Sequence, residues 1–133
     1  MERRKSPRYS IYLRVYFPEH DLWGFTKNIS LDGCFVQTVE TISAGFLADL
    51  LLELPVVGVV ALKGYIHHSG SQGDGVGMQF VQVRFAPEQS DYYAIYTDFL
   101  KIMPELEKVR IDYLDKVQKG LLKLQTMPEK KDG

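Results

Sequence analysis

The sequence is poor in residues that cross-link a chain. Its 133 residues include a single cysteine, Cys34, which cannot form an internal disulfide or supply a cysteine-rich zinc site. A chain of this length buries roughly two-thirds of the surface that it exposes when unfolded, so a hydrophobic core can hold it together. We therefore expect one domain in a reducing compartment, without a structural metal or cofactor.

Long hydrophobic runs are also missing. The longest apolar stretches are interrupted within a few residues by Glu53, Pro55 and Gly58, and the opening segment MERRKSPR is charged with no apolar run behind it. A membrane-spanning helix needs about 20 mostly apolar residues, and a secretory leader needs an apolar centre. Neither is expected, and we predict a cytoplasmic protein.

The net charge of −1 conceals an uneven distribution. Residues 1–14 carry five basic side chains against one acidic side chain, whereas acidic residues outnumber basic ones in the rest of the chain. Positive charge gathered at one end is typical of an arm that binds an anion, although a solvated tail has the same composition.

Six short segments have the patterns of β-strands. In residues 9–17 apolar and polar side chains alternate, and the other five segments lie between turn signals. The expected strands are residues 9–17, 22–29, 33–40, 48–55, 56–69 and 76–85. Because no helical pattern separates them, they predict a mainly β fold, a six-stranded antiparallel β-barrel.

The hydrophobic period changes from about residue 88 onward. Apolar residues then recur at helical spacing from Tyr92 to Leu124, which predicts a long C-terminal α-helix over residues 89–125. Pro104 should kink this helix or begin a second one, because proline lacks an amide hydrogen. The distal half has no surface to cover, and its near-heptad spacing favours a homo-oligomer formed through this helix.

The predicted organisation has four parts. Residues 1–8 form a flexible basic arm, residues 9–87 the barrel, residues 88–126 the C-terminal helical region, and residues 127–133 a disordered tail. The arm and the barrel each carry one motif.

The first motif is RKSPR, which places Arg4 and Arg8 four residues apart; the second is NISLDG, which contains Asn28, Ser30 and Gly33. Arginine presents a planar fork of donors that fits phosphate oxygens and stacks on aromatic rings. The second motif offers an amide, a hydroxyl and, at the glycine, either a positive φ or a close backbone approach. Together they predict a pocket for an anionic, planar, hydrogen-bonding ligand.

The order RxxxR followed by [DN]xSxxG resembles the PilZ family of bacterial cyclic di-GMP receptors, over about residues 3–100. The resemblance implies a six-stranded barrel with a C-terminal helix. It also implies that Arg4 and Arg8 hold the phosphates of the ligand and stack on its guanines, and that Asn28, Ser30 and Gly33 line the guanine pocket.

Two details of the resemblance concern the ligand itself. Asn28 supplies one carbonyl acceptor where an aspartate would supply two, so weaker guanine binding is expected. Arg3, directly before the first motif, is similar to family members that bind an intercalated pair of ligand molecules.

These observations predict a non-enzymatic receptor whose arm becomes ordered on binding cyclic di-GMP and thereby alters contact with an unknown downstream protein. No segment gathers an acid, a base, a nucleophile and an oxyanion site, so an enzyme is not expected. One alternative is a barrel that binds no ligand and acts through its C-terminal helix. Another is a barrel for single-stranded nucleic acid, which the lack of clustered Lys and Arg along the strands disfavours.

Overall fold

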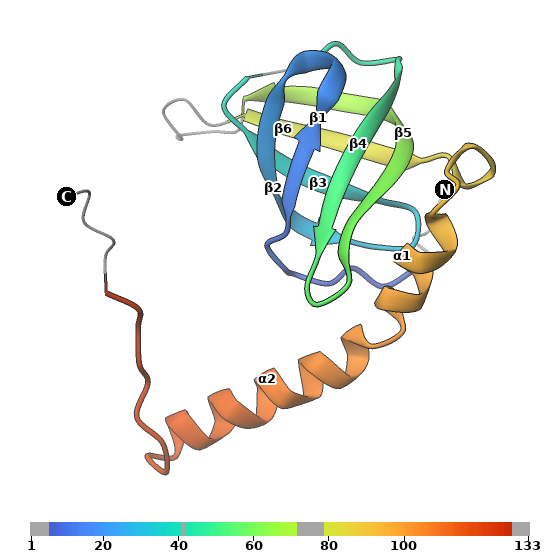
Figure 1. Ribbon diagram of the computed structural model, residues 1–133. Coiled ribbons are helices and arrows are strands. Elements are labelled where there is room, and N and C mark those ends of the chain that lie inside the picture. Colours follow the sequence, from blue (N-terminus) through green and yellow to red (C-terminus); the bar gives the residue numbers. More distant parts are fainter. Residues whose placement is uncertain (1–5, 41, 72–78, 129–133) are drawn as a thin grey trace, which may run out of the picture. The chain divides into compact units, whose positions relative to one another are not determined.

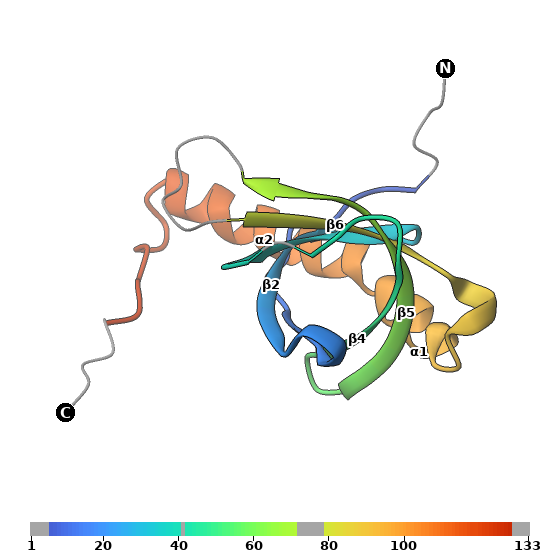
Figure 2. The ribbon, with the colours of Figure 1, turned by 90° about the horizontal axis from the view of Figure 1, so that it is seen from above.

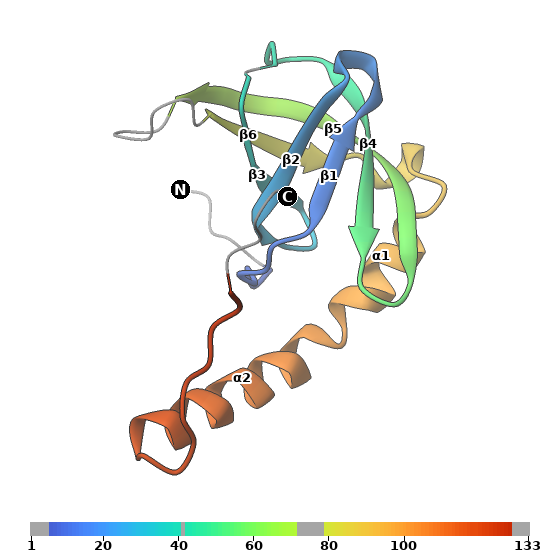
Figure 3. The ribbon, with the colours of Figure 1, turned by 60° about the vertical axis from the view of Figure 1, so that its left-hand side comes forward.

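Six antiparallel strands close into a barrel in the order β1-β2-β3-β6-β5-β4 (Figures 1 and 2). The computed structural model describes residues 6–40, 42–71 and 79–128. The strands are β1 (Arg14–Phe17), β2 (Leu22–Ile29), β3 (Gly33–Thr38), β4 (Leu47–Leu54), β5 (Gly58–Ser71) and β6 (Gln79–Phe85). Strand β1 lies between β2 and β4 and so closes the barrel (Figure 3). The predicted six-stranded barrel is confirmed.

The first strand is shorter than its alternating pattern predicted. β1 begins at Arg14. The segment before it pairs with β2 through an isolated bridge between Tyr9 and Ile29 and through the Thr26 amide, which donates to the Leu13 carbonyl at 2.9 Å. Thr26 of β2 takes over part of the pairing: its hydroxyl accepts a hydrogen bond from the Leu13 amide at 2.8 Å and donates to the Ile11 carbonyl at 2.6 Å. The Thr26 side chain thus supplements an irregular backbone pairing over these residues.

The interior of the barrel is almost entirely aliphatic. Alternate residues of each strand point inward, as the burial of Leu50, Leu52 and Leu54 along β4 shows. The largest fully buried side chains are Tyr96, Phe17, Ile29, Leu50, Leu52, Leu54, Leu62, Ile66, Val15, Val36, Val81 and Val83. The buried Thr26 joins this core because its hydroxyl is fully hydrogen-bonded, as described above.

Two β-bulges interrupt the alternation on neighbouring parts of the outer surface. In β2 the register shifts between Thr26 and Asn28, and in β5 it shifts between Ile66 and His68. An extra residue at a bulge re-aims the side chains that follow it. Because of the first bulge, Asn28 is half-buried at a position that strict alternation would turn into the core, and Ile29 is buried instead.

The C-terminal helical region consists of α1 (Tyr93–Leu100) and α2 (Met103–Gln118), separated at Lys101 and Ile102. Pro104 lies in the first turn of α2, where a missing amide hydrogen costs no helical hydrogen bond. The predicted break near Pro104 is confirmed. The predicted helix bounds of residues 89–125 are wrong at both ends, because α1 begins at Tyr93 and α2 ends at Gln118. Residues Pro87–Gln89 form a short 3-10 turn before α1.

Gly120 explains why the helix ends early. It has a φ of +77°, its amide donates to the Val117 carbonyl at 3.1 Å, and the Leu121 amide donates to the Lys116 carbonyl at 2.9 Å. This pair of hydrogen bonds is the Schellman motif that commonly closes a helix. Leu121 and Leu124 are therefore not part of the helical stripe that the sequence predicted.

The chain divides into two compact units, one ending at Lys101 and one beginning at Ile102. Helix α1 thus belongs to the same unit as the barrel. Among the described residues, none of the helices has the length and apolar character needed to cross a bilayer.

Candidate ligand-binding site

The four described residues that the two motifs offered as ligand contacts line one pocket. This pocket, called here the motif pocket, has a volume of 620 Å³ and contains Arg8, Asn28, Ser30 and Gly33. Its other lining residues are Leu31, Asp32, Cys34, His67, Gln82, Val83, Arg84, Phe85, Pro87 and Tyr93. Arg3 and Arg4 lie outside the described residues. The volume falls in the range of small-molecule sites, roughly 300 to 1,000 Å³.

A side-chain hydrogen bond joins the two motifs directly. The Arg8 guanidinium donates from Nη1 to Oδ1 of Asn28 at 3.1 Å. Arg8 is exposed, and Asn28 reaches the pocket because of the bulge in β2. The contact links the arginine of the first motif to the amide of the second at the motif pocket.

Ser30 shapes the turn between β2 and β3. Its hydroxyl oxygen accepts hydrogen bonds from the amides of Asp32 at 3.2 Å and Gly33 at 3.3 Å, and its own amide donates to the Gly33 carbonyl at 2.9 Å. The side chain is buried, with 6% of its surface exposed. In this structure the serine hydroxyl orders the backbone that forms the pocket edge.

Gly33 is required by a close approach of β3 and β6. A Cβ atom added to Gly33 would lie 1.9 Å from the Val83 carbonyl oxygen, far inside van der Waals contact. Gly33 is not one of the glycines with positive φ, which in the described chain are Gly45, Gly58 and Gly120. The positive φ that the turn allowed for Gly33 is therefore wrong, and the glycine is required by the close approach of the β6 backbone.

Helix α1 fastens the same turn from outside the barrel. The Tyr96 hydroxyl donates to the Ser30 carbonyl at 2.6 Å, and the Tyr93 hydroxyl donates to the Leu31 carbonyl at 2.6 Å. Burial raises the pKa of Tyr96 and of Tyr93, and the carboxylate of Asp32 raises the pKa of Tyr93 further. Both phenols therefore stay protonated and remain donors at neutral pH.

The opposite wall comes from β5 and β6, and sequence reasoning missed it. His67, Gln82 and Arg84 of these strands line the motif pocket. The alternation in β6 marks Arg84 as an outward residue, but no local signal shows that β6 pairs with β3. His67 is the extra residue of the second bulge, which alternation alone cannot locate.

Cys34 lies beneath the pocket as a buried thiol. Burial raises the pKa of this thiol to about 12, so the reactive thiolate is scarce at neutral pH. Cys34 is therefore a small buried apolar residue rather than a reactive thiol. Within the part of the chain that the structure describes, no group of three or more His, Cys, Asp or Glu side chains could hold a metal ion.

The PilZ domain family model matches residues 2–90. The chain therefore belongs to the PilZ domain family, and the resemblance noted in the sequence is confirmed. No curated protein sequence matches this chain significantly.

Several solved structures share the fold of this chain. The PilZ domain of YcgR from Escherichia coli with c-di-GMP has a TM-score of 0.64 and 18% identity, and the match covers 87% of this chain and 100% of that one. The structure of YcgR from Escherichia coli in complex with c-di-GMP has a TM-score of 0.66 and 19% identity, and the match covers 88% of this chain and 51% of that one. The Bacillus subtilis inhibitor of motility MotI/DgrA has a TM-score of 0.63 and 14% identity, and the match covers 84% of this chain and 53% of that one. This chain thus spans about half the length of the two longer structures.

Proposed function

We propose that this chain is a cyclic di-GMP receptor that acts by binding rather than by catalysis. The proposal depends on one observation: Arg8, Asn28, Ser30 and Gly33, which come from two separate motifs, line the same pocket. The chain belongs to the PilZ family, and similar folds include structures described as complexes with c-di-GMP.

The chemistry of the motif pocket suits such a ligand. Cyclic di-GMP carries two phosphates and two guanines, so it needs cations and a surface that can hydrogen-bond to a base edge. Arg8 supplies a charged fork, and the Asn28 carbonyl supplies an acceptor for a guanine donor. We assign Arg4 to a further phosphate and stacking contact, as the family motif implies, and Arg3, which directly precedes that motif, to a second, intercalated ligand molecule.

Ligand binding would then order the N-terminal arm. In this mechanism residues 1–8 close over the motif pocket when Arg8 exchanges part of its contact with Asn28 for a phosphate. The covered pocket presents a new surface to a downstream protein. The cost of ordering the arm lowers the affinity, and the same ordering makes the protein a switch.

Isothermal titration with cyclic di-GMP tests the receptor, with GTP and cyclic di-AMP as ligand controls. We expect saturable binding of cyclic di-GMP alone. Arg8→Ala and Arg4→Ala should each weaken it about tenfold or more, because a charge-assisted hydrogen bond is worth about 1.5 to 3 kcal/mol. Arg14→Ala is the matched control, since Arg14 is exposed beside Glu53 at 3.6 Å and does not line the motif pocket.

If the folded protein does not bind cyclic di-GMP, the proposal is contradicted. The alternative of a barrel that binds no ligand and acts through its C-terminal helix would then be favoured. Salt-dependent binding of single-stranded oligonucleotides without base preference would instead favour the nucleic-acid alternative.

We further propose that α2 pairs with a second copy of the chain. Leu106 and Leu114 are exposed on this helix, with Arg110 between them on the same stripe. A paired acidic residue from the second copy would be needed to accommodate Arg110.

A further inference from the structure

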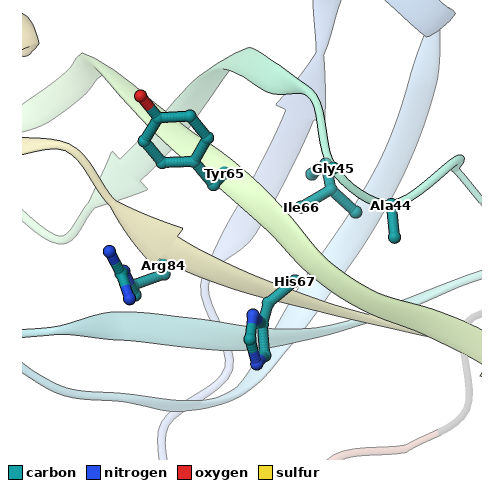
Figure 4. A pocket seen from close by; sticks show the side chains of 6 residues that line it. All are labelled: Ala44, Gly45, Tyr65, Ile66, His67 and Arg84. Carbon is teal, nitrogen blue, oxygen red and sulfur yellow. The ribbon is translucent and has the colours of Figure 1, made fainter.

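A second hollow adjoins the motif pocket and shares two of its residues. This hollow, called here the Tyr65 hollow, has a volume of 530 Å³ and is lined by Ala44, Gly45, Tyr65, Ile66, His67 and Arg84. Figure 4 shows Tyr65, His67 and Arg84 on neighbouring strands, with Ala44 and Gly45 in the loop beside them. His67 and Arg84 also line the motif pocket, so they form the border between the two cavities.

The strand register places Arg84 at the centre of this surface. In the antiparallel pairing, Arg84 lies directly opposite Gly33 on one side and directly opposite Tyr65 on the other. Directly opposite residues point to the same face of a sheet. The Arg84 side chain therefore lies between Tyr65 and the NISLDG motif, and Gly33 has no side chain to separate it from the motif pocket.

The guanidinium of Arg84 is not neutralised by a neighbouring acid. Arg84 is exposed, and across residues 6–40, 42–71 and 79–128 the ion pairs involve Arg14 and five lysines but not Arg84. A free arginine at the border of two cavities can reach an anion in either of them.

The Tyr65 hollow differs chemically from the motif pocket. Its lining includes the exposed aromatic ring of Tyr65, and among its described residues there is no carboxylate or amide side chain. An aromatic ring stacks on any nucleobase, because every base has a π-face. This hollow can therefore hold a base without reading its hydrogen-bonding edge.

We propose that the chain binds a cyclic dinucleotide asymmetrically: the motif pocket reads one guanine, Arg84 holds the phosphate at the border, and Tyr65 stacks on the second base. This inference rests on the proposed receptor function and deepens it. It assigns two contact residues outside the RxxxR and NxSxxG motifs. It also predicts a specificity, because only one of the two bases is recognised as guanine.

Titration of the full chain with three ligands tests the specificity. Cyclic di-GMP should bind most tightly, the mixed dinucleotide 3′,3′-cyclic GMP-AMP should bind within about tenfold of it, and cyclic di-AMP should not bind. The mixed ligand keeps one guanine for the motif pocket and places adenine on Tyr65, where stacking tolerates it. Failure of the mixed ligand to bind, while cyclic di-GMP binds, would overturn the asymmetric arrangement.

Variants of the two new residues test the contacts. Arg84→Ala should weaken the binding of cyclic di-GMP about tenfold or more. Arg84→Lys keeps the charge but loses the planar fork of donors, so its affinity should fall less. Tyr65→Ala should weaken the binding of cyclic di-GMP about fivefold or more, whereas Tyr65→Phe should bind it like the unaltered chain. Arg14→Ala is again the matched control, and thermal unfolding confirms that each variant is folded.

The outcomes separate this inference from the receptor function. If Arg8→Ala weakens binding while Arg84→Ala and Tyr65→Ala do not, the receptor stands and the asymmetric site is wrong. If the unaltered chain does not bind cyclic di-GMP, the receptor function itself fails, and this inference fails with it.

Discussion

Gly33 combines a place in the ligand motif with a structural requirement that no other residue type can meet. Any Cβ at this position would collide with the Val83 carbonyl, which is backbone and cannot rotate away. We predict that Gly33→Ala separates β3 from β6 and lowers the free energy of unfolding by about 3 kcal/mol or more. Urea unfolding followed by circular dichroism measures this loss.

Gly45→Ala is the matched control for that experiment. Gly45 has a φ of +92° but open space around its Cβ position, so alanine there meets backbone strain of about 1 kcal/mol without a collision. Equal losses for the two variants would contradict the steric explanation of Gly33.

The buried thiol of Cys34 should make the free energy of unfolding fall as the pH becomes alkaline. Burial raises the pKa of its thiol from 9.0 to about 12, so the folded state keeps a proton that the unfolded state loses. The contribution is complete below pH 9 and decreases as the pH rises toward 12, by up to about 1.4 kcal/mol per pH unit. The free energy of unfolding should therefore decrease over this window.

The variant Cys34→Ala isolates this contribution, since Tyr93 and Tyr96 also have raised pKa values and act in the same direction. Alanine removes the thiol proton but leaves both phenols. Its stability should depend less steeply on pH between 9 and 12, and identical slopes for the two proteins would contradict the assignment.

At the scale of elements, α1 acts as a clamp on the β2–β3 turn. The hydroxyls of Tyr96 and Tyr93 donate to successive carbonyls of this turn, but only Tyr96 is fully buried. Tyr96→Phe should lower the free energy of unfolding by about 1 to 3 kcal/mol, because a buried carbonyl loses its donor. Tyr93→Phe should cost less, since water can reach its partner.

Thermal and urea unfolding of both variants tests this difference. Tyr96→Phe should also weaken cyclic di-GMP binding, because the turn that it steadies carries Ser30 and Gly33. A Tyr96→Phe protein as stable as the unaltered chain would show that the turn keeps its shape without α1.

The sequence predicts elements better than it predicts how they meet. Alternation and turn residues are local signals, and they were enough for six strands and for the break near Pro104. The pairing of β3 with β6 is not local, so the place of Arg84 opposite Gly33 could not be inferred. The bulges at Lys27 and His67 are equally invisible to alternation. The helix end near Gly120 did have a local signal, because a glycine often follows the last turn of a helix. The predicted helix instead followed the apolar stripe as far as Leu124.

At the scale of the whole molecule, the two compact units have different sources of stability. The unit ending at Lys101 contains the barrel core and α1. In the other unit, α2 carries exposed pairs such as Asp112 with Lys116 at 3.1 Å and Asp115 with Lys119 at 3.0 Å. Each such pair contributes only about 0.3 to 0.5 kcal/mol, and a 16-residue helix is marginal without further packing.

This contrast predicts the outcome of truncation after Lys101. The shortened chain should unfold cooperatively and still bind cyclic di-GMP, because the motif pocket lies within the first unit. If α2 pairs with a second copy, sedimentation should show that the full chain associates and the truncated chain does not. Leu106→Glu with Leu114→Glu in the full chain should have the same effect, because two buried charges would oppose pairing. Association that survives both changes would place the self-contact on the barrel instead of α2.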